Sequence, residues 1–129
     1  MNLHEMYEMA RRRLLQTEEE PYAAFLAREL TRFVSGYEQF PLCARDIPVS
    51  KETCETMDAA VSRAIKGEPL AYILGNWPFY GLQMTVDSRV LIPRDDTCAV
   101  TDLAIQYAGR IPKPKILDLC TGSGCIGLA

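Results

Sequence analysis

The sequence predicts a mainly α-helical protein, with a helical bundle, then a β-hairpin, then a strand that leads through a glycine loop into a helix. Over the first third of the chain, apolar residues recur at three- and four-residue steps, as on one face of a helix. After Gly75, aromatic and β-branched residues gather around glycines, as in short strands joined by turns. We therefore expect helices within residues 3–66 and a hairpin within residues 76–93.

Three helices of the predicted bundle each show one apolar stripe. The stripe of the first consists of Leu3, Met6, Tyr7, Ala10 and Leu14. The stripe of the second consists of Tyr22, Phe25, Leu26, Leu30, Phe33 and Val34. The stripe of the third consists of Cys54, Met57, Val61, Ala64 and Ile65. Pro21 and Ser50 suit helix starts, and Gly36 and Gly67 suit helix ends. Because one-sided helices are not stable alone, we expect them to pack together.

The second half of the sequence predicts shorter helices and strands. Val90, Leu91 and Ile92 suggest a further strand after the hairpin, and Ile116–Leu119 has the apolar run of a buried strand. A helix is expected from about Asp96, with an apolar face made of Val100, Leu103, Ala104 and Tyr107. Segment 111–115, Ile-Pro-Lys-Pro-Lys, is a stiff linker and the clearest domain boundary.

Composition excludes several classes of protein. The formal net charge of −3 lacks the basic excess of a general nucleic-acid or acidic-membrane binder. The five cysteines include no Cys-x-x-Cys pair, so neither a disulfide framework nor a metal site is expected. The chain shows no secretory signal and no apolar run long enough for a membrane span, so cytoplasmic residence is expected.

The stretch from Lys115 to Ala129 carries the clearest chemistry. Glycines at 122 and 124 let a ligand approach the backbone, and Asp118 offers an acceptor near the end of the expected strand. Gly122-x-Gly124-x-x-Gly127 matches the dinucleotide fingerprint in form. The spacing acid-x-x-x-Gly-x-Gly instead resembles the first motif of S-adenosylmethionine-dependent methyltransferases, which we favour over a dinucleotide enzyme or a turn without a ligand.

Three further motifs narrow the resemblance to one family. They are Gly67-Glu-Pro-Leu-Ala-Tyr-Ile-Leu-Gly75, Trp77-Pro-Phe-Tyr-Gly81, and Val90-Leu-Ile-Pro-Arg94 with Thr97. Followed by Asp118-Leu-Cys-Thr-Gly-Ser-Gly124, they resemble in order and spacing the release-factor glutamine methyltransferases, the HemK/PrmC family. The resemblance extends over nearly the whole chain and is specific from Gly67 onward.

The resemblance implies an architecture and an activity. Residues 1–75 would form a helical substrate-recognition domain, 76–94 a β-hairpin connector, and 95–129 the start of a truncated, Rossmann-like domain that binds S-adenosylmethionine. Enzymes of this family methylate the side-chain nitrogen of the glutamine in the Gly-Gly-Gln loop of peptide chain release factors. The implied partner is therefore a release factor, with no membrane and no direct nucleic-acid contact.

Site residues follow from the matching motifs. The cofactor-binding residues would be Asp118, Cys120, Thr121, Gly122, Ser123 and Gly124. The residues that border the substrate pocket would be Leu91, Arg94 and Thr97. The family's usual Arg-Pro-Glu/Asp-Thr-Glu reads Arg94-Asp-Asp-Thr-Cys98 here, and Cys120 replaces a common glycine. The substrate-holding Asn-Pro-Pro-Tyr motif is expected downstream of Ala129, so this chain alone should be inactive.

Other interpretations remain open from the residues alone. The chain could belong to a methyltransferase that acts on a ribosomal protein or on adenine in nucleic acid, to a non-catalytic release-factor-binding module, or to a nicotinamide-dependent enzyme. Trp77, Phe79 and Tyr80 suit either a core or a partner surface, and Arg94 could be only a salt-bridge partner. Residues 115–129 are expected outside any parallel sheet, packed back on the hairpin and the preceding helix or against a second copy.

Overall fold

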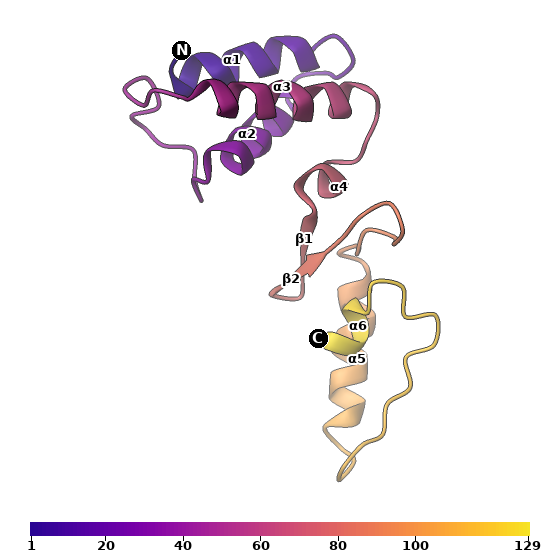
Figure 1. Ribbon diagram of the computed structural model, residues 1–129. Coiled ribbons are helices and arrows are strands. Elements are labelled where there is room, and N and C mark those ends of the chain that lie inside the picture. Colours follow the sequence, from indigo (N-terminus) through magenta and orange to yellow (C-terminus); the bar gives the residue numbers. More distant parts are fainter. The chain divides into compact units, whose positions relative to one another are not determined.

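The computed structural model describes every residue from Met1 to Ala129 and divides into two compact units, Met1–Leu74 and Gly75–Ala129. The first unit contains the helices α1 (Leu3–Leu14), α2 (Tyr22–Ser35), α3 (Lys51–Ile65) and α4 (Leu70–Leu74) (Figure 1). The second contains the strands β1 (Asn76–Phe79) and β2 (Leu82–Thr85) and the helices α5 (Thr97–Ala108) and α6 (Cys125–Leu128). The mainly helical fold with one hairpin is confirmed. None of the helices combines the length and apolarity that a membrane span requires.

The core of the first unit lies among α1, α2 and α3, each of which contacts the other two. The predicted stripe of α1 is confirmed, because Leu3, Met6 and Leu14 are completely buried. Tyr7 is half-buried at the edge of this stripe, where its ring lies 5.1 Å from that of Phe40. Helix α1 therefore contributes one continuous face to the core.

The predicted stripe of α2 is partly wrong. Leu26 and Leu30 are buried as expected, but the rings of three aromatic residues are substantially exposed, those of Tyr22, Phe25 and Phe33. The buried face is rotated toward small residues, Ala23, Ala27 and Thr31. Small side chains let neighbouring helices approach closely, and the Thr31 hydroxyl is satisfied by the carbonyl oxygen of Ala27 at 2.7 Å. The face of α2 that packs against the core is therefore the one with small side chains, and the larger aromatic side chains lie outside it.

The free backbone amides in the first turn of α1 find hydrogen-bond acceptors both nearby and far along the chain. Asn2 Oδ1 accepts from the Glu5 amide at 2.9 Å, and Glu5 Oε2 accepts from the Asn2 amide at 2.9 Å, which together form a capping box. The amides of Leu3 and His4 donate to the carbonyl oxygens of Ile47 at 2.9 Å and Ala44 at 3.2 Å. The loop before α3 therefore completes the first turn of α1.

Helix α3 begins as predicted at its N-cap, where Ser50 Oγ accepts from the Thr53 amide at 3.0 Å. Its core face consists of Met57, Ala60, Val61 and Ala64, while Cys54 and Ile65 are only half-buried. Arg13 of α1 pairs with Asp58 and donates to Ser62 Oγ at 3.1 Å, which joins α1 to α3.

In the second unit, β1 and β2 form an antiparallel hairpin in which Asn76 is opposite Thr85 and Phe79 is opposite Leu82. Tyr80 and Gly81 form the turn between them. The predicted further strand at Val90–Ile92 is wrong, because these residues are irregular and pair with no strand. An apolar run forms a strand only where a neighbour can take its backbone hydrogen bonds.

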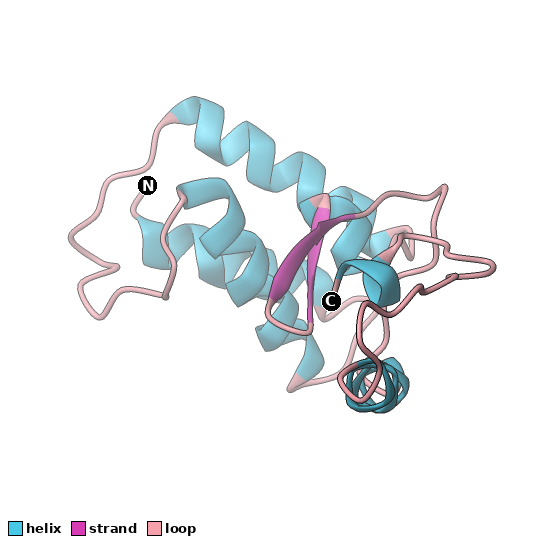
Figure 2. Cartoon of the chain, turned by 90° about the horizontal axis from the view of Figure 1, so that it is seen from below, coloured by secondary structure: helices cyan, strands magenta, loops and turns pink.

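The predicted apolar face of α5 is present but uncovered: Val100, Leu103 and Tyr107 are each more than half exposed. The strand expected at residues 116–119 does not form, and Figure 2 draws the segment that joins α5 to α6 as a loop. Ile116, Leu117 and Leu119 are exposed, whereas Asp118 is half-buried. The expected position of this tail outside a parallel sheet is confirmed, and α6 packs on α5. The second unit therefore presents a broad apolar surface that its own elements leave open.

Candidate functional site

The glycine loop between residues 118 and 125 has an unusual backbone. Cys120, Gly122 and Gly124 all have positive φ, at 58°, 57° and 79°. The left-handed region suits glycine and is unfavourable for a residue with a Cβ atom, so Cys120 holds a strained conformation at this point. Alternating left-handed residues turn the chain sharply and leave Gly122 open, with no atom other than the Cys120 carbonyl oxygen near its missing Cβ position.

Two hydrogen bonds hold the loop. Thr121 Oγ1 donates to Asp118 Oδ2 at 2.9 Å, and the Gly124 amide donates to the Thr121 carbonyl oxygen at 2.8 Å. Asp118 is half-buried, and no hydrogen bond is formed by its second carboxylate oxygen. The loop thus keeps an anionic acceptor beside an open, glycine-lined backbone. Ser123 and Cys120 complete the turn, but their side chains form no hydrogen bond.

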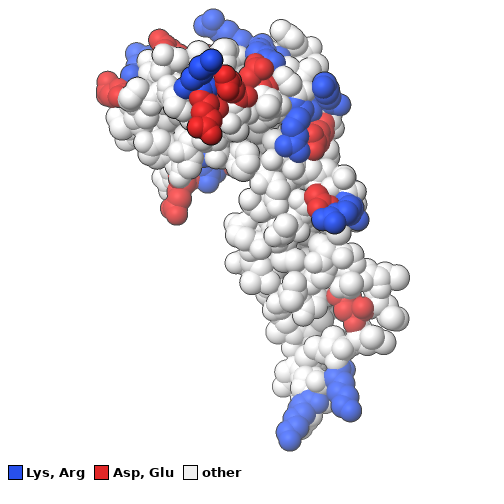
Figure 3. Space-filling model, viewed as in Figure 1, with Lys and Arg blue, Asp and Glu red and all other residues white.

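A hollow of about 810 Å³ lies beside this loop within the second unit. Thr101, Ile105 and Ala108 of α5 form one wall, and Leu117 and Ile126 of the tail form the opposite wall. Figure 3 shows charged side chains over much of the helical unit and an extended uncharged surface on the second unit. Segment 111–115, predicted as a linker, lies inside the second unit and contributes Ile111 and Pro114 to this hollow.

The candidate substrate-pocket residues lie on one irregular segment between β2 and α5. Leu91 is exposed, with 73% of its surface accessible, and Arg94 is also exposed. Thr97 begins α5, and its amide donates to the Arg94 carbonyl oxygen at 3.0 Å. Arg94 forms no ion pair, so the structural salt-bridge role is not present in this chain. No hydrogen bond joins these residues to the glycine loop.

One contact in this unit is not predicted by any sequence pattern. Tyr80 Oη donates to Asp102 Oδ1 at 2.6 Å, which links the hairpin turn to α5. This hydrogen bond, with burial and the nearby Asp102 charge, raises the pKa of Tyr80. The two residues are 22 positions apart, so no helical or strand spacing could have revealed them. Of the three aromatic residues of this motif, Phe79 is buried, Trp77 is half-buried and Tyr80 is exposed, so only Phe79 is a core residue.

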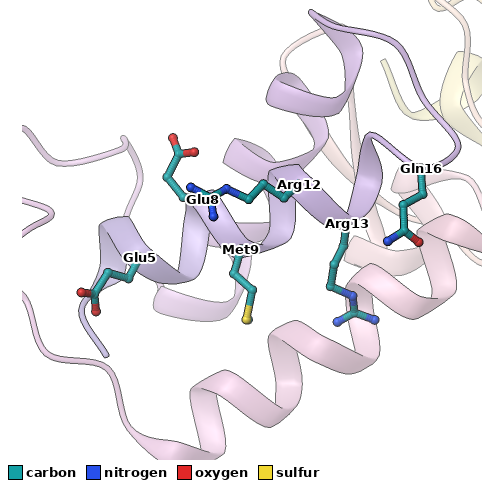
Figure 4. A pocket seen from close by; sticks show the side chains of 6 residues that line it. All are labelled: Glu5, Glu8, Met9, Arg12, Arg13 and Gln16. Atoms are coloured by element: carbon teal, nitrogen blue, oxygen red, sulfur yellow. The ribbon is translucent and has the colours of Figure 1, made fainter.

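A second hollow, of about 400 Å³, runs along α1 and is shown in Figure 4. Its lining residues are Glu5, Glu8, Met9, Arg12, Arg13 and Gln16. Most of their charges are already engaged: Glu8 pairs with Arg11 at 3.0 Å, and Arg13 pairs with Asp58. No group of three or more metal-binding side chains gathers anywhere in the chain. The glycine loop is therefore the best candidate for a ligand site.

Comparison with known proteins shows the family of the chain. The sequence family described as the PrmC N-terminal domain matches residues 5–75, more than half of the chain. A release factor glutamine methyltransferase of Thermodesulfovibrio yellowstonii is 35% identical over 105 residues, which is 80% of this chain and 38% of that protein.

Two further relatives carry the same name. The protein of Fusobacterium nucleatum is 48% identical over 69 residues, covering 54% of this chain and 20% of its own length. The protein of Coxiella burnetii is 39% identical over 84 residues, covering 65% of this chain and 30% of its own length. The chain therefore spans between one fifth and two fifths of these three relatives.

Proposed function

The chain belongs to the PrmC family, and we propose that it supplies the helical domain and the first part of the catalytic domain of a release factor glutamine methyltransferase. The proposal is supported by the length of the chain that aligns with the relatives. The domain match ends at residue 75, whereas the alignment with the Thermodesulfovibrio yellowstonii protein covers 105 residues. That alignment must therefore include part of the second unit, where the glycine loop and residues 91–97 lie.

The proposed methyl donor is S-adenosylmethionine, and the chemistry of the glycine loop fits it. The methionine end of this cofactor carries an ammonium group, for which the Asp118 carboxylate is a suitable acceptor. Gly122 has no side chain and open space beside it, so a ligand can reach the backbone there. Asp118, Cys120, Thr121, Gly122, Ser123 and Gly124 would hold the cofactor. When bound, S-adenosylmethionine supplies an electrophilic methyl group to the side-chain nitrogen of glutamine.

The proposed task of the remaining site residues is to orient the substrate. Leu91 and Arg94 are exposed, and Arg94 forms no ion pair, so both side chains are available to a protein partner. Thr97 fixes the turn that ends at α5. Catalysis in this scheme rests on positioning the amide nitrogen and excluding water. The helical unit, residues 1–75, would recognise the release factor, and the reaction would take place in the cytoplasm, where the free cysteines stay reduced.

A chimeric enzyme tests the proposal. Residues 1–129 replace the aligned segment of the Thermodesulfovibrio yellowstonii relative, and the purified chimera is incubated with a release factor and S-adenosylmethionine. We expect methylation of the glutamine in the Gly-Gly-Gln loop, read by mass spectrometry. The unaltered relative serves as the positive control, and a release factor with that glutamine replaced by alanine serves as the negative control.

Folding must be separated from function in this test. Circular dichroism and calorimetric titration with S-adenosylmethionine show whether the chimera is folded and binds the cofactor. A folded chimera that binds S-adenosylmethionine but leaves the release factor unmodified would refute the proposed substrate. A folded chimera that does not bind the cofactor would refute the proposed role of the glycine loop.

A further inference from the structure

Tyr80 occupies a backbone conformation that its residue type disfavours. It is the first residue of the two-residue turn between β1 and β2, with φ at 49°, and Gly81 follows with φ at 78°. Hairpin turns with two positive φ angles favour asparagine, aspartate or glycine at the first position, and a bulky aromatic residue there is an outlier. Such strain persists only where surrounding structure holds it, and it marks functional positions.

The side chain of Tyr80 shows what this conformation achieves. Its hydroxyl donates to Asp102 Oδ1 at 2.6 Å, the distance typical of a charge-assisted hydrogen bond, which is stronger than one between neutral groups. Asp102 lies in the second turn of α5, one turn after Cys98. The left-handed turn residue thus directs a hydroxyl from the hairpin to the helix, which an asparagine side chain would be too short to do.

This hydrogen bond joins the two elements on either side of residues 86–96, the segment that contains the candidate substrate residues Leu91 and Arg94. Residues 86–96 run from β2 to α5, so a contact between the hairpin turn and α5 links the two elements that flank the segment. Val86 and Pro93 are buried and anchor the segment. Leu91, which lies between them in sequence, and Arg94, which follows Pro93, are exposed. The Val86 amide donates to the Gly75 carbonyl oxygen at 3.1 Å, which holds the first end to the base of the hairpin.

We propose that the Tyr80–Asp102 hydrogen bond positions the loop of residues 86–96, and with it Leu91, Arg94 and Thr97, for the protein substrate. The proposal rests on the proposed methyltransferase function. Tyr80 and Asp102 are positioning residues: they contact neither substrate nor cofactor in this scheme. Losing the hydrogen bond loosens the loop while the strands and the glycine loop remain formed.

Amide exchange in the 129-residue chain tests the structural step without any activity. Tyr80→Phe removes only the hydroxyl, and we expect the amides of Thr97 and Cys98 to exchange about threefold to tenfold faster, the loss typical of one hydrogen bond. Asp102→Leu should speed the exchange of these two amides by the same factor. Asp102→Asn should speed it less, because the asparagine side-chain oxygen still accepts the hydrogen bond from Tyr80. Tyr107→Phe is the matched control, since Tyr107 is an exposed tyrosine of α5 whose hydroxyl forms no hydrogen bond.

Tyr80→Asn separates positioning from general stability. Asparagine tolerates the left-handed conformation, so the strands β1 and β2 should exchange no faster than before. Thr97 and Cys98 should nevertheless exchange faster, because the hydroxyl is gone. If both regions change together, or if Tyr80→Phe leaves Thr97 and Cys98 unchanged, the positioning role is wrong.

The chimeric enzyme tests the link to substrate. We expect Tyr80→Phe to raise the KM for the release factor about threefold to tenfold, with kcat and the Kd of S-adenosylmethionine little changed. An unchanged KM would overturn the proposal. Activity of the unsubstituted chimera reports on the proposed function separately, and the exchange experiment decides the structural step even if that chimera is inactive.

Discussion

Gly127 lies directly against the side chain of Asp118. A Cβ atom at position 127 would stand 3.1 Å from Asp118 Oδ2, which is tighter than most contacts of a Cβ atom. That same oxygen accepts the hydroxyl of Thr121, so the glycine on α6 and the threonine in the loop meet at one carboxylate. The third glycine of the Gly-x-Gly-x-x-Gly pattern therefore serves the packing of Asp118.

The substitution Gly127→Ala should displace the Asp118 carboxylate from Thr121. The carboxylate is the movable end of a flexible side chain, so rotation of Asp118 relieves the contact and breaks the 2.9 Å hydrogen bond. NMR shifts of Thr121 and Asp118 should change, whereas Ser123→Ala, which removes no hydrogen bond, should leave them in place. Retention of the Thr121–Asp118 hydrogen bond in Gly127→Ala would contradict this account.

Valine at Gly122 or Gly124 should weaken S-adenosylmethionine binding in the chimeric enzyme. Both glycines have positive φ, at 57° and 79°, which a β-branched residue strongly disfavours. At about 1–3 kcal/mol for such strain, the Kd should rise about fivefold to 150-fold. Calorimetric titration measures the effect, with the helical content of the first unit as the folding control. Unchanged affinity in both variants would exclude the loop from the cofactor site.

Two adjacent leucines should differ sharply in their effect on stability. Leu14 is fully buried and Leu15 is 40% exposed. Leu14→Ala should lower the free energy of unfolding of the helical unit by about 2–5 kcal/mol, through lost burial and a residual cavity. Leu15→Ala should cost less than about 1 kcal/mol. Urea denaturation followed by circular dichroism compares the two, and equal losses would show that the core is assigned wrongly.

Asp87 should titrate unusually low. Hydrogen bonds from the Arg89 side chain and amide lower the pKa of Asp87 to about 2. Because the folded-state pKa lies below the unfolded value, this contact stabilises the fold above about pH 4 and is lost as the pH falls through 2. Carboxyl NMR titration measures it. Arg89→Ala should return the Asp87 pKa toward its ordinary value, and a pKa that stays near 2 would require another cause.

The 129-residue chain by itself should transfer no methyl group. It contains no Asn-Pro-Pro-Tyr sequence, the motif that holds the substrate amide in the family it resembles. Incubation with radiolabelled S-adenosylmethionine and a release factor should leave the glutamine unmodified, while the Thermodesulfovibrio yellowstonii enzyme labels it in parallel. Labelling by the purified chain above the level of a no-protein blank would show that the motif is dispensable.

The helices could be predicted from sequence, but the inward face of α2 could not. Periodic apolar residues and caps such as Ser50 act locally, and the structure confirms them. Leu26 and Leu30 of α2 are flanked by aromatic residues on one side and alanines on the other, so periodicity alone allows two rotations. Contact with α1 and α3 selects the alanine side, and that choice depends on distant residues.

The sequence predicts the motifs of the candidate site, but it does not predict which residues of those motifs contact one another. The glycine loop could be located because Gly122 and Gly124 meet a local backbone requirement. The Tyr80–Asp102 hydrogen bond depends on how the hairpin packs on α5, which no local pattern encodes. Ile116–Leu119 has a strand's composition, yet strand pairing is a property of two segments, and no second segment lies beside it here.

The bonds at the start of α1 bear on how the bundle folds. The amides of Leu3 and His4 donate to the carbonyl oxygens of Ile47 and Ala44, which lie 44 and 40 positions further along the chain. Closing a loop of that length is entropically costly and slows folding relative to a bundle stabilised by neighbours alone. In a nascent chain that stops before residue 44, the Asn2–Glu5 capping box can form, but the amides of Leu3 and His4 have only water as a partner until the segment that precedes α3 has been synthesised and docked.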